Sequence, residues 1–229
     1  MPISKNKDEN FFKTWTPAMA YVLGFFTADG SMRQTKRGTH FIEFQITDRE
    51  LLFSIRDAMR SDHKITERPM RPRHCKPIYR LQIGSRELFE DLCALGMMQN
   101  KTKYVRLPTI PDVYFGDFLR GYFDGDGNVV FSYYRKAKRP YLSKSFATRF
   151  TSGSRTLLMD LKNRIVSLLD ADGSFYFAGG AWRLSYSHHS SEKLFQSMYH
   201  EGDVADLIYL VRKYKIFLEA RDAVVAQFG

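Results

Sequence analysis

The amino-acid sequence predicts an α+β protein built from two similar halves, each containing helices and antiparallel strand pairs. Three observations lead to this prediction. A glycine-containing apolar segment occurs twice, an alternating apolar pattern typical of strands follows each copy, and segments of helical periodicity separate the strands. With 229 residues the chain is long enough for two domains of roughly 100 residues each.

The repeated segment predicts a helix at the start of each half. Residues 22–30 read Val-Leu-Gly-Phe-Phe-Thr-Ala-Asp-Gly, and residues 119–127 read Leu-Arg-Gly-Tyr-Phe-Asp-Gly-Asp-Gly, at an offset of 97. Thr16-Pro17 favours a helix start, because a hydroxyl can cap the first turn and proline suits the first helical position. Gly30 and Gly127 are expected to end the two helices.

The segments that follow each copy also correspond. Residues 41–47 and 146–150 alternate as strands do, and each is followed by an apolar stripe of helical spacing, at 51–59 and 158–168. Helices gathered on one face of antiparallel strand pairs make an α+β fold.

A second strand pair and a third helix complete each half. Residues 79–83 are echoed at 182–186, so the offset grows to 103, and we expect the extra loop residues within 132–139. Each half therefore reads αββαββα. We place the boundary near Pro108, with an N-terminal half 1–107 and a C-terminal half 108–229 about a pseudo-two-fold axis.

Composition limits the classes of partner. Lys and Arg total 35 against 25 Asp and Glu, for a net charge of +10. This excess favours a polyanion, with nucleic acid the first candidate and simple solubility the alternative. Two cysteines exclude a disulfide framework or Cys-rich zinc site. Residues 1–10 lack a signal-peptide core and residues 18–26 are too short to span a bilayer. We expect no membrane association, and a bacterial or archaeal cytoplasm, with an organelle as the alternative.

Asp29 and Asp126 would lie in the last turns of the two repeated helices. A carboxylate is disfavoured there, because the helix dipole places partial negative charge at the C-terminus. If the helices lie side by side, with Gly24 and Ala28 facing Gly121 and Gly125, both carboxylates and several backbone carbonyls converge. A hard divalent cation such as Mg²⁺ would compensate the charge.

Two simpler interpretations of these acids fit the sequence less well. A single Asp-Gly after an apolar run is usually only a turn, but two copies in matching repeats of a basic chain are harder to explain that way. An EF-hand starting at Asp124 fails, because its sixth position is Val129 instead of Gly and its twelfth is Arg135 instead of Glu.

The two segments resemble the paired motifs of the LAGLIDADG homing endonucleases, in the arrangement where one chain carries both motifs. The second motif, Asp117–Gly127, is the more specific. The first departs from the pattern, because Thr27 stands where the family often has Asp, but Asp29 is retained. The resemblance covers most of the chain and implies two DNA-binding saddles of antiparallel strands, with the motif helices at the central interface.

The resemblance also implies site residues and a cofactor. Asp29 and Asp126 would bind the catalytic metals, helped by the carbonyls of Ala28 and Gly125, with Mg²⁺ as the cofactor and Mn²⁺ or Ca²⁺ able to substitute for binding. A basic residue is expected near each scissile phosphate. Lys101, with Lys103 in reserve, and Lys213 are the candidates, and a solvated surface lysine is the alternative. Asp48 takes the position where the family frequently has Gln.

Double-stranded DNA is the expected partner, bound by a monomer without an obligate protein partner. Basic and polar residues on or beside the strands would contact bases and phosphates. In the first half these are Arg33, Gln34, Lys36, Arg37, Arg68, Arg71, Arg73 and Lys76. In the second half they are Tyr133, Arg135, Lys136, Lys138, Arg139, Lys144 and Arg149.

The activity that follows from the resemblance is site-specific, metal-dependent hydrolysis of both strands of a long asymmetric target. The alternative is a nucleic-acid binder that does not cleave, such as an intron-splicing maturase or a DNA-binding regulator. A basic scaffold without catalysis would leave the carboxylates at both helix ends unexplained.

Overall fold

The computed structural model describes residues 5–68, 76–99, 103–135, 142–200 and 203–228. Within them the first half runs helix, strand pair, helix, strand pair, helix. Its elements are α1 (Pro17–Asp29), β1 (Gly30–Gln34), β2 (His40–Ile46), α2 (Arg49–Ala58), β3 (Ile65–Arg68), β4 (Ile78–Gly84) and α3 (Arg86–Ala94). This is the predicted αββαββα order.

The second half repeats this order and adds a helix. After a short 3₁₀ turn, η2 (Asp112–Tyr114), come α4 (Phe115–Asp126), β5 (Gly127–Arg135), β6 (Leu142–Ser152), α5 (Arg155–Leu169), β7 (Ser174–Ala178), β8 (Ala181–Tyr186), α6 (His188–Met198) and α7 (Val211–Phe228).

Each half contains one four-stranded antiparallel sheet, with orders β1-β2-β4-β3 and β5-β6-β8-β7. The registers correspond: Phe44 pairs with Gly30 and Leu81, and Phe150 pairs with Gly127 and Leu184. Gly30 and Phe44 are separated by 14 positions in the sequence, whereas the equivalent pair, Gly127 and Phe150, is separated by 23. The extra residues therefore fall in the β5–β6 hairpin, where the sequence predicted them.

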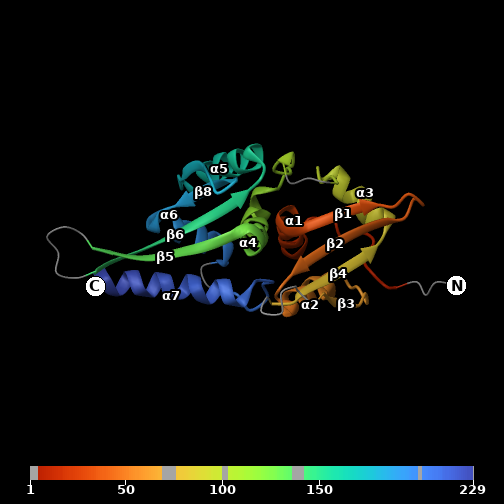
Figure 1. Ribbon diagram of the computed structural model, residues 1–229, viewed down its shortest axis with the longest axis horizontal. Coiled ribbons are helices and arrows are strands. Elements are labelled where there is room, and N and C mark those ends of the chain that lie inside the picture. The colour runs from red at the N-terminus through yellow and green to blue at the C-terminus, as the bar shows by residue number, and fades with distance from the viewer. Residues whose placement is uncertain (1–4, 69–75, 100–102, 136–141, 201–202, 229) are drawn as a thin grey trace.

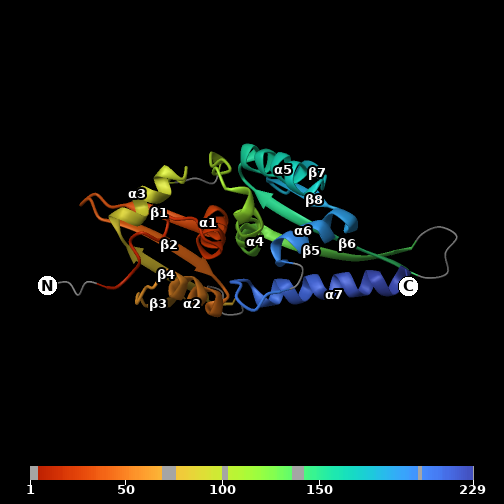
Figure 2. The ribbon, with the colours of Figure 1, turned by 180° about the vertical axis from the view of Figure 1, so that it is seen from behind.

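The sheets have one covered face and one open face. In the first sheet the alternate residues Ile42, Phe44, Leu81 and Ile83 are fully buried beneath helices. Figure 1 shows the strands of both sheets in front, and Figure 2, from behind, shows α2, α3, α5 and α6 on the other side. The remaining residues of each strand form the open face of the sheet.

The motif helices α1 and α4 lie side by side between the two sheets (Figure 1). They approach through glycine: a methyl group added at Gly24 would lie 2.0 Å from the carbonyl oxygen of Phe118, and one at Gly121 would lie 2.0 Å from that of Tyr21. These two contacts are related by the 97-residue offset. They confirm the predicted pseudo-two-fold packing of the two motifs.

The long helix α7 was not part of the predicted αββαββα order. It lies along the β5–β6 hairpin (Figure 1), and its Phe217 ring packs against Phe123 and Phe146. The chain leading into it is held by α4, where buried Arg120 donates to the carbonyls of Met198 and Ile208. None of the helices in the described ranges is long and apolar enough to cross a membrane.

Candidate active site

The two predicted metal-binding acids occupy equivalent helix ends. α1 starts as predicted, with the Thr16 hydroxyl accepting from the Met19 amide and Pro17 in the first turn. It ends at Gly30, whose N–H donates to the carbonyl of Phe26, and α4 ends likewise at Gly127. Asp29 is exposed and Asp126 is partly exposed, so both carboxylates can reach a ligand from solvent.

The helix packing brings these ends together. A methyl group added at Gly125 would lie 2.4 Å from the Cβ of Ala28 and 3.3 Å from Oδ2 of Asp29. Burial raises the pKa of Tyr122, and the charges of both Asp126 and Asp29 add to this effect. Asp29 therefore lies beside the end of α4, the helix that carries Asp126.

This donor set fits a hard divalent cation. Two carboxylates and nearby backbone carbonyls supply oxygen ligands, and Mg²⁺ usually keeps several waters and adds phosphate oxygens. Across the described ranges there is no cluster of three or more His, Cys, Asp or Glu side chains suited to a metal. A cation between Asp29 and Asp126 would thus depend on carbonyls, water or substrate to complete its coordination.

Lys213 lies behind the end of α4, not at its surface. Its side chain is 8% exposed, and Nζ donates to the carbonyls of Phe123, Asp124 and Gly127 at 2.7, 2.7 and 2.6 Å. A fourth contact, 3.2 Å long, reaches the carbonyl of Gly125. Burial lowers the pKa of Lys213 to about 8, against the opposing attraction of Asp124. The ammonium therefore caps the negative end of the helix dipole.

Asp124 of α4 links the second half to α1 of the first half through a hydrogen bond. Its Oδ2 accepts hydrogen bonds from the Tyr21 hydroxyl of α1 and from the Leu210 amide before α7, both at 2.7 Å. Burial raises the pKa of this carboxyl to about 6 although the Tyr21 hydrogen bond lowers it. At the equivalent position of α1, the Thr27 hydroxyl donates to the carbonyl of Leu23.

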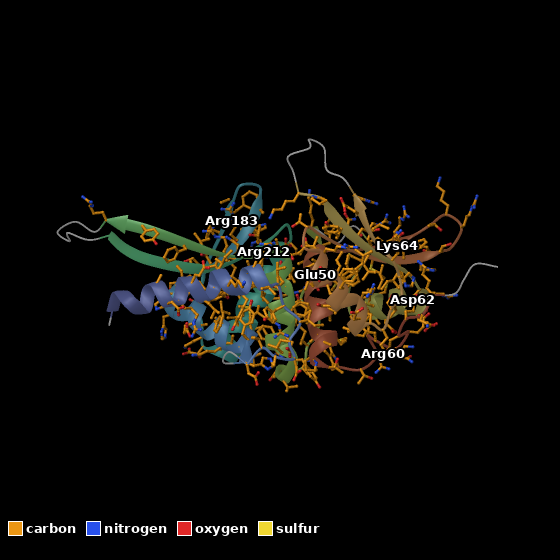
Figure 3. All side chains as sticks on the ribbon, turned by 90° about the horizontal axis from the view of Figure 1, so that it is seen from below. Glu50, Arg60, Asp62, Lys64, Arg183 and Arg212 are labelled. Atoms are coloured by element: carbon orange, nitrogen blue, oxygen red, sulfur yellow. The ribbon has the colours of Figure 1, made fainter. Side chains whose placement is uncertain are left out.

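A surface pocket opens beside Asp29. It is lined by Asp29, Gly125, Gln45, Thr47 and Arg212, among others, so both halves contribute to it. Figure 3 shows Arg212 beside the ends of the motif helices. Sequence reasoning missed Gln45, Thr47 and Arg212, although the period-two pattern of β2 could have placed Gln45 on the open face.

Asp48 forms an ion pair with Arg212, a residue of this pocket. It precedes α2 and accepts from Nε of Arg212 at 3.2 Å, which joins the first half to α7. Gln45, three residues earlier, is the amide that lines the pocket next to Asp29. Asp48 thus acts here as the ion-pair partner of a pocket arginine.

Several predicted DNA contacts lie on or beside the open faces. Arg33 and Arg68 line a pocket on the open face of the first sheet. Arg149 alternates with buried Phe150 on β6 and so belongs to the open face of the second sheet. Gln34 is exposed at the end of β1, Lys36 and Arg37 lie in the following turn, and Lys76 is exposed just before β4.

Two predicted contacts of the second half lie on the other side of their strand. Along β5, Tyr133 and Arg135 alternate in phase with Phe131, which packs against the core, and the Tyr133 and Phe131 rings are 5.0 Å apart. Tyr133 and Arg135 therefore lie on the opposite face of the sheet from Arg149, and their contact with DNA stays a prediction. The strand register, which the sequence left open in the long hairpin, decides this orientation.

The remaining candidates are one exposed lysine and residues that lie wholly or partly outside the described set. Lys103 is exposed. Lys144 belongs to β6, but its side chain is outside the described set. The rest fall outside the described residues: Lys101, Arg71, Arg73, Lys136, Lys138 and Arg139.

Comparisons with known proteins agree with this geometry. Residues 16–95 match the sequence model of a family described as LAGLIDADG-like domain. A comparison with curated proteins gave no match.

Solved structures resemble the whole chain. The homing endonuclease I-WcaI bound to its DNA recognition sequence has 15% identity and a TM-score of 0.62, and the match covers 90% of each chain. The LAGLIDADG homing endonuclease I-LtrWI bound to target DNA has 15% identity and a TM-score of 0.62, over 95% of this chain and 92% of the other. The meganuclease I-SmaMI bound to uncleavable DNA has 12% identity and a TM-score of 0.62, over 92% and 90%.

The sequence match covers the first motif, and the structural matches extend over both halves with their central helix pair. Residues 16–95 thus match a LAGLIDADG-like domain, and the described chain has the two-motif fold of the LAGLIDADG homing endonucleases that it resembles.

Proposed function

We propose that this protein is a site-specific DNA endonuclease that uses Mg²⁺ to hydrolyse both strands of a long, asymmetric target. The observation that carries the proposal is the pair of carboxylates, Asp29 and Asp126, at the abutting ends of two glycine-packed helices. They lie between two sheets with open faces in a chain of net charge +10. A charge of this sign favours binding to the phosphate backbone.

The residues divide the chemistry between them. Asp29 and Asp126 would hold the cations, which when bound supply a Lewis acid and lower the pKa of water. Lys213 neutralises part of the negative potential behind them through its carbonyl contacts. Arg212, half exposed in the pocket beside Asp29, is positioned to meet a phosphate once it leaves Asp48.

The single-chain arrangement supports action as a monomer. Both acids belong to one polypeptide, and the two halves are joined at the α1–α4 interface by buried contacts such as Tyr21 to Asp124. The two open faces differ in sequence, so their target half-sites would differ as well. The structures that resemble this chain include proteins bound to DNA targets, which supports the choice of substrate.

The test is cleavage of a randomised duplex library by the wild type and by Asp29→Asn and Asp126→Asn. Asp62→Asn is the matched control, since Asp62 is an exposed acid of the first half far from the motif-helix ends (Figure 3). We expect the wild type and the control to cut a restricted set of sequences only with Mg²⁺, and EDTA to abolish cutting. Both site variants should bind the same sequences without completing the double-strand break.

The alternative function has a distinct result. A wild-type protein that enriches particular sequences but never cuts them, with Mg²⁺ or Mn²⁺, would be a non-cleaving nucleic-acid binder. Selective enrichment of intron RNA over duplex DNA would then point to a maturase. Equal cutting by the wild type and both site variants would remove Asp29 and Asp126 from the mechanism.

A further inference from the structure

The open face of the first sheet carries a carboxylate at its centre. Glu43 on β2 accepts from Nε of Arg80 at 2.5 Å and from the side-chain amide of Gln82 at 3.1 Å, and it also contacts the amide of Gln45. The Glu43 and Arg80 side chains are 13% and 20% exposed. One acid thus fixes three polar side chains on a surface that would face DNA.

Glu43 lies in a pocket whose other charged residues are all arginines. Ser31, Arg33, Phe41 and Arg68 line the pocket together with Glu43, Arg80 and Gln82. A carboxylate here is unfavourable for binding to phosphates, because like charges repel. Simple affinity for a polyanion therefore does not explain why Glu43 occupies the middle of this face.

The second sheet carries different charged residues at the equivalent positions. Since Phe44 and Leu81 correspond in register to Phe150 and Leu184, Glu43 corresponds to Arg149 and Arg80 to Arg183. Among the described residues of its open face the second sheet has no acidic side chain. The two halves thus place a neutralised Glu–Arg pair in one sheet and two arginines in the other.

The groups held by Glu43 are those that read base edges. Arginine pairs through two N–H groups with the O6 and N7 atoms of guanine, and glutamine pairs with adenine through its amide. The ion pair with Glu43 uses Nε of Arg80, and no other hydrogen bond of this guanidinium occurs among the described residues. Its terminal Nη groups are thus available, as is the Oε1 acceptor of Gln82.

Resting on the proposed function, we propose that Glu43 is a positioning residue for sequence specificity. It orients Arg80 towards guanine and Gln82 towards adenine, so that the first sheet contributes base discrimination. The second sheet, through Arg149 and Arg183, contributes more of the salt-dependent affinity for phosphates. Ordering before binding matters, because a side chain that is already fixed loses less conformational freedom in the complex.

The experiment is binding-site selection from a randomised duplex library in EDTA, so that the readout is binding and not cleavage. The variants are Glu43→Gln, Gln82→Ala and Arg149→Gln, each checked for a wild-type melting transition. We expect Glu43→Gln to lower base discrimination roughly tenfold at one or two positions of one half-site. Its affinity for unrelated DNA should rise, because a negative charge has been removed.

The other two variants separate the parts of the proposal. Gln82→Ala keeps the Glu43–Arg80 ion pair and should lose only the adenine preference. Arg149→Gln should weaken binding to all sequences and reduce the slope of log affinity against log salt by about one, with the base preference unchanged.

The outcomes distinguish this inference from the proposed function. If the wild type selects a sequence and Glu43→Gln or Gln82→Ala selects it equally strongly, the role of Glu43 is refuted and the endonuclease proposal is untouched. If Arg149→Gln loses base preference as much as Glu43→Gln does, the division of labour between the sheets is refuted. If the wild type binds no duplex DNA, both proposals fail.

Discussion

Replacing Lys213 with methionine tests whether this lysine is chiefly a helix cap. The ammonium carries three N–H groups, so its loss removes the lysine donor from up to three carbonyls at the end of α4, those of Asp124, Gly125 and Gly127. The Phe123 carbonyl still accepts from the Gly127 N–H. Each unsatisfied buried acceptor costs about 1–3 kcal/mol. The change also relieves the cost of burying the charge: a pKa lowered from 10.5 to about 8 corresponds to about 3 kcal/mol. The net loss should be roughly 3 kcal/mol of unfolding free energy.

The assays are urea unfolding and thermal unfolding at pH 7, with Lys215→Met as the control because Lys215 is an exposed lysine of the same helix. For a chain of this length, roughly 3 kcal/mol should lower Tm by on the order of 10 °C, while the control should change little. Suppose instead that Lys213→Met is as stable as the control and has lost only DNA cleavage. Lys213 would then act on the scissile phosphate, and the capping role would be wrong.

Two further predictions concern the helix interface. Gly121→Ala should destabilise the protein by about 3 kcal/mol or more in urea unfolding, since its methyl group would meet the Tyr21 carbonyl, whereas Gly84→Ala, with 3.4 Å to its nearest neighbour, should change little. The pKa of Asp124 is about 6 in the folded protein, above its ordinary 3.8, so stability is lost as pH rises through 6. Asp124→Asn should therefore be the more stable by up to about 3 kcal/mol at pH 7 and equal to the wild type near pH 4; equal stability at both pH values would contradict this.

Local sequence rules were sufficient to predict the helices and strands that occur in both halves. The helix start at Thr16, the ends at Gly30 and Gly127, and the two strand pairs follow from capping chemistry and from periods of 3.6 and 2. The close approach at Gly24 and Gly121 was also predictable, because two helices can touch backbone to backbone only where side chains are absent.

Contacts between distant residues were not predictable in this way. Arg212 and Asp48 are 164 residues apart, and Lys213 meets the end of α4 across almost 90 residues. Neither pairing leaves a periodic signal. The face of Tyr133 depends on the register within a hairpin longer than its counterpart, and a shift of one residue reverses every side chain. Helix α7 was missed although Leu210, Phe217 and Ala220 are buried at helical spacing.

The charges at the motif-helix ends explain how one site can fold before it binds a cation. Asp29, Asp126 and the carbonyls of two helix C-termini would together repel one another if left uncompensated. Lys213 offsets part of this potential from behind, through carbonyls of α4, and Asp48 retains Arg212 in an ion pair of its own. The carboxylates of Asp29 and Asp126 have exposed surface, whereas Lys213 is buried behind the end of α4. We therefore expect a divalent cation to enter from the solvent side of the interface, while contacts on the buried side stabilise the helix ends without it.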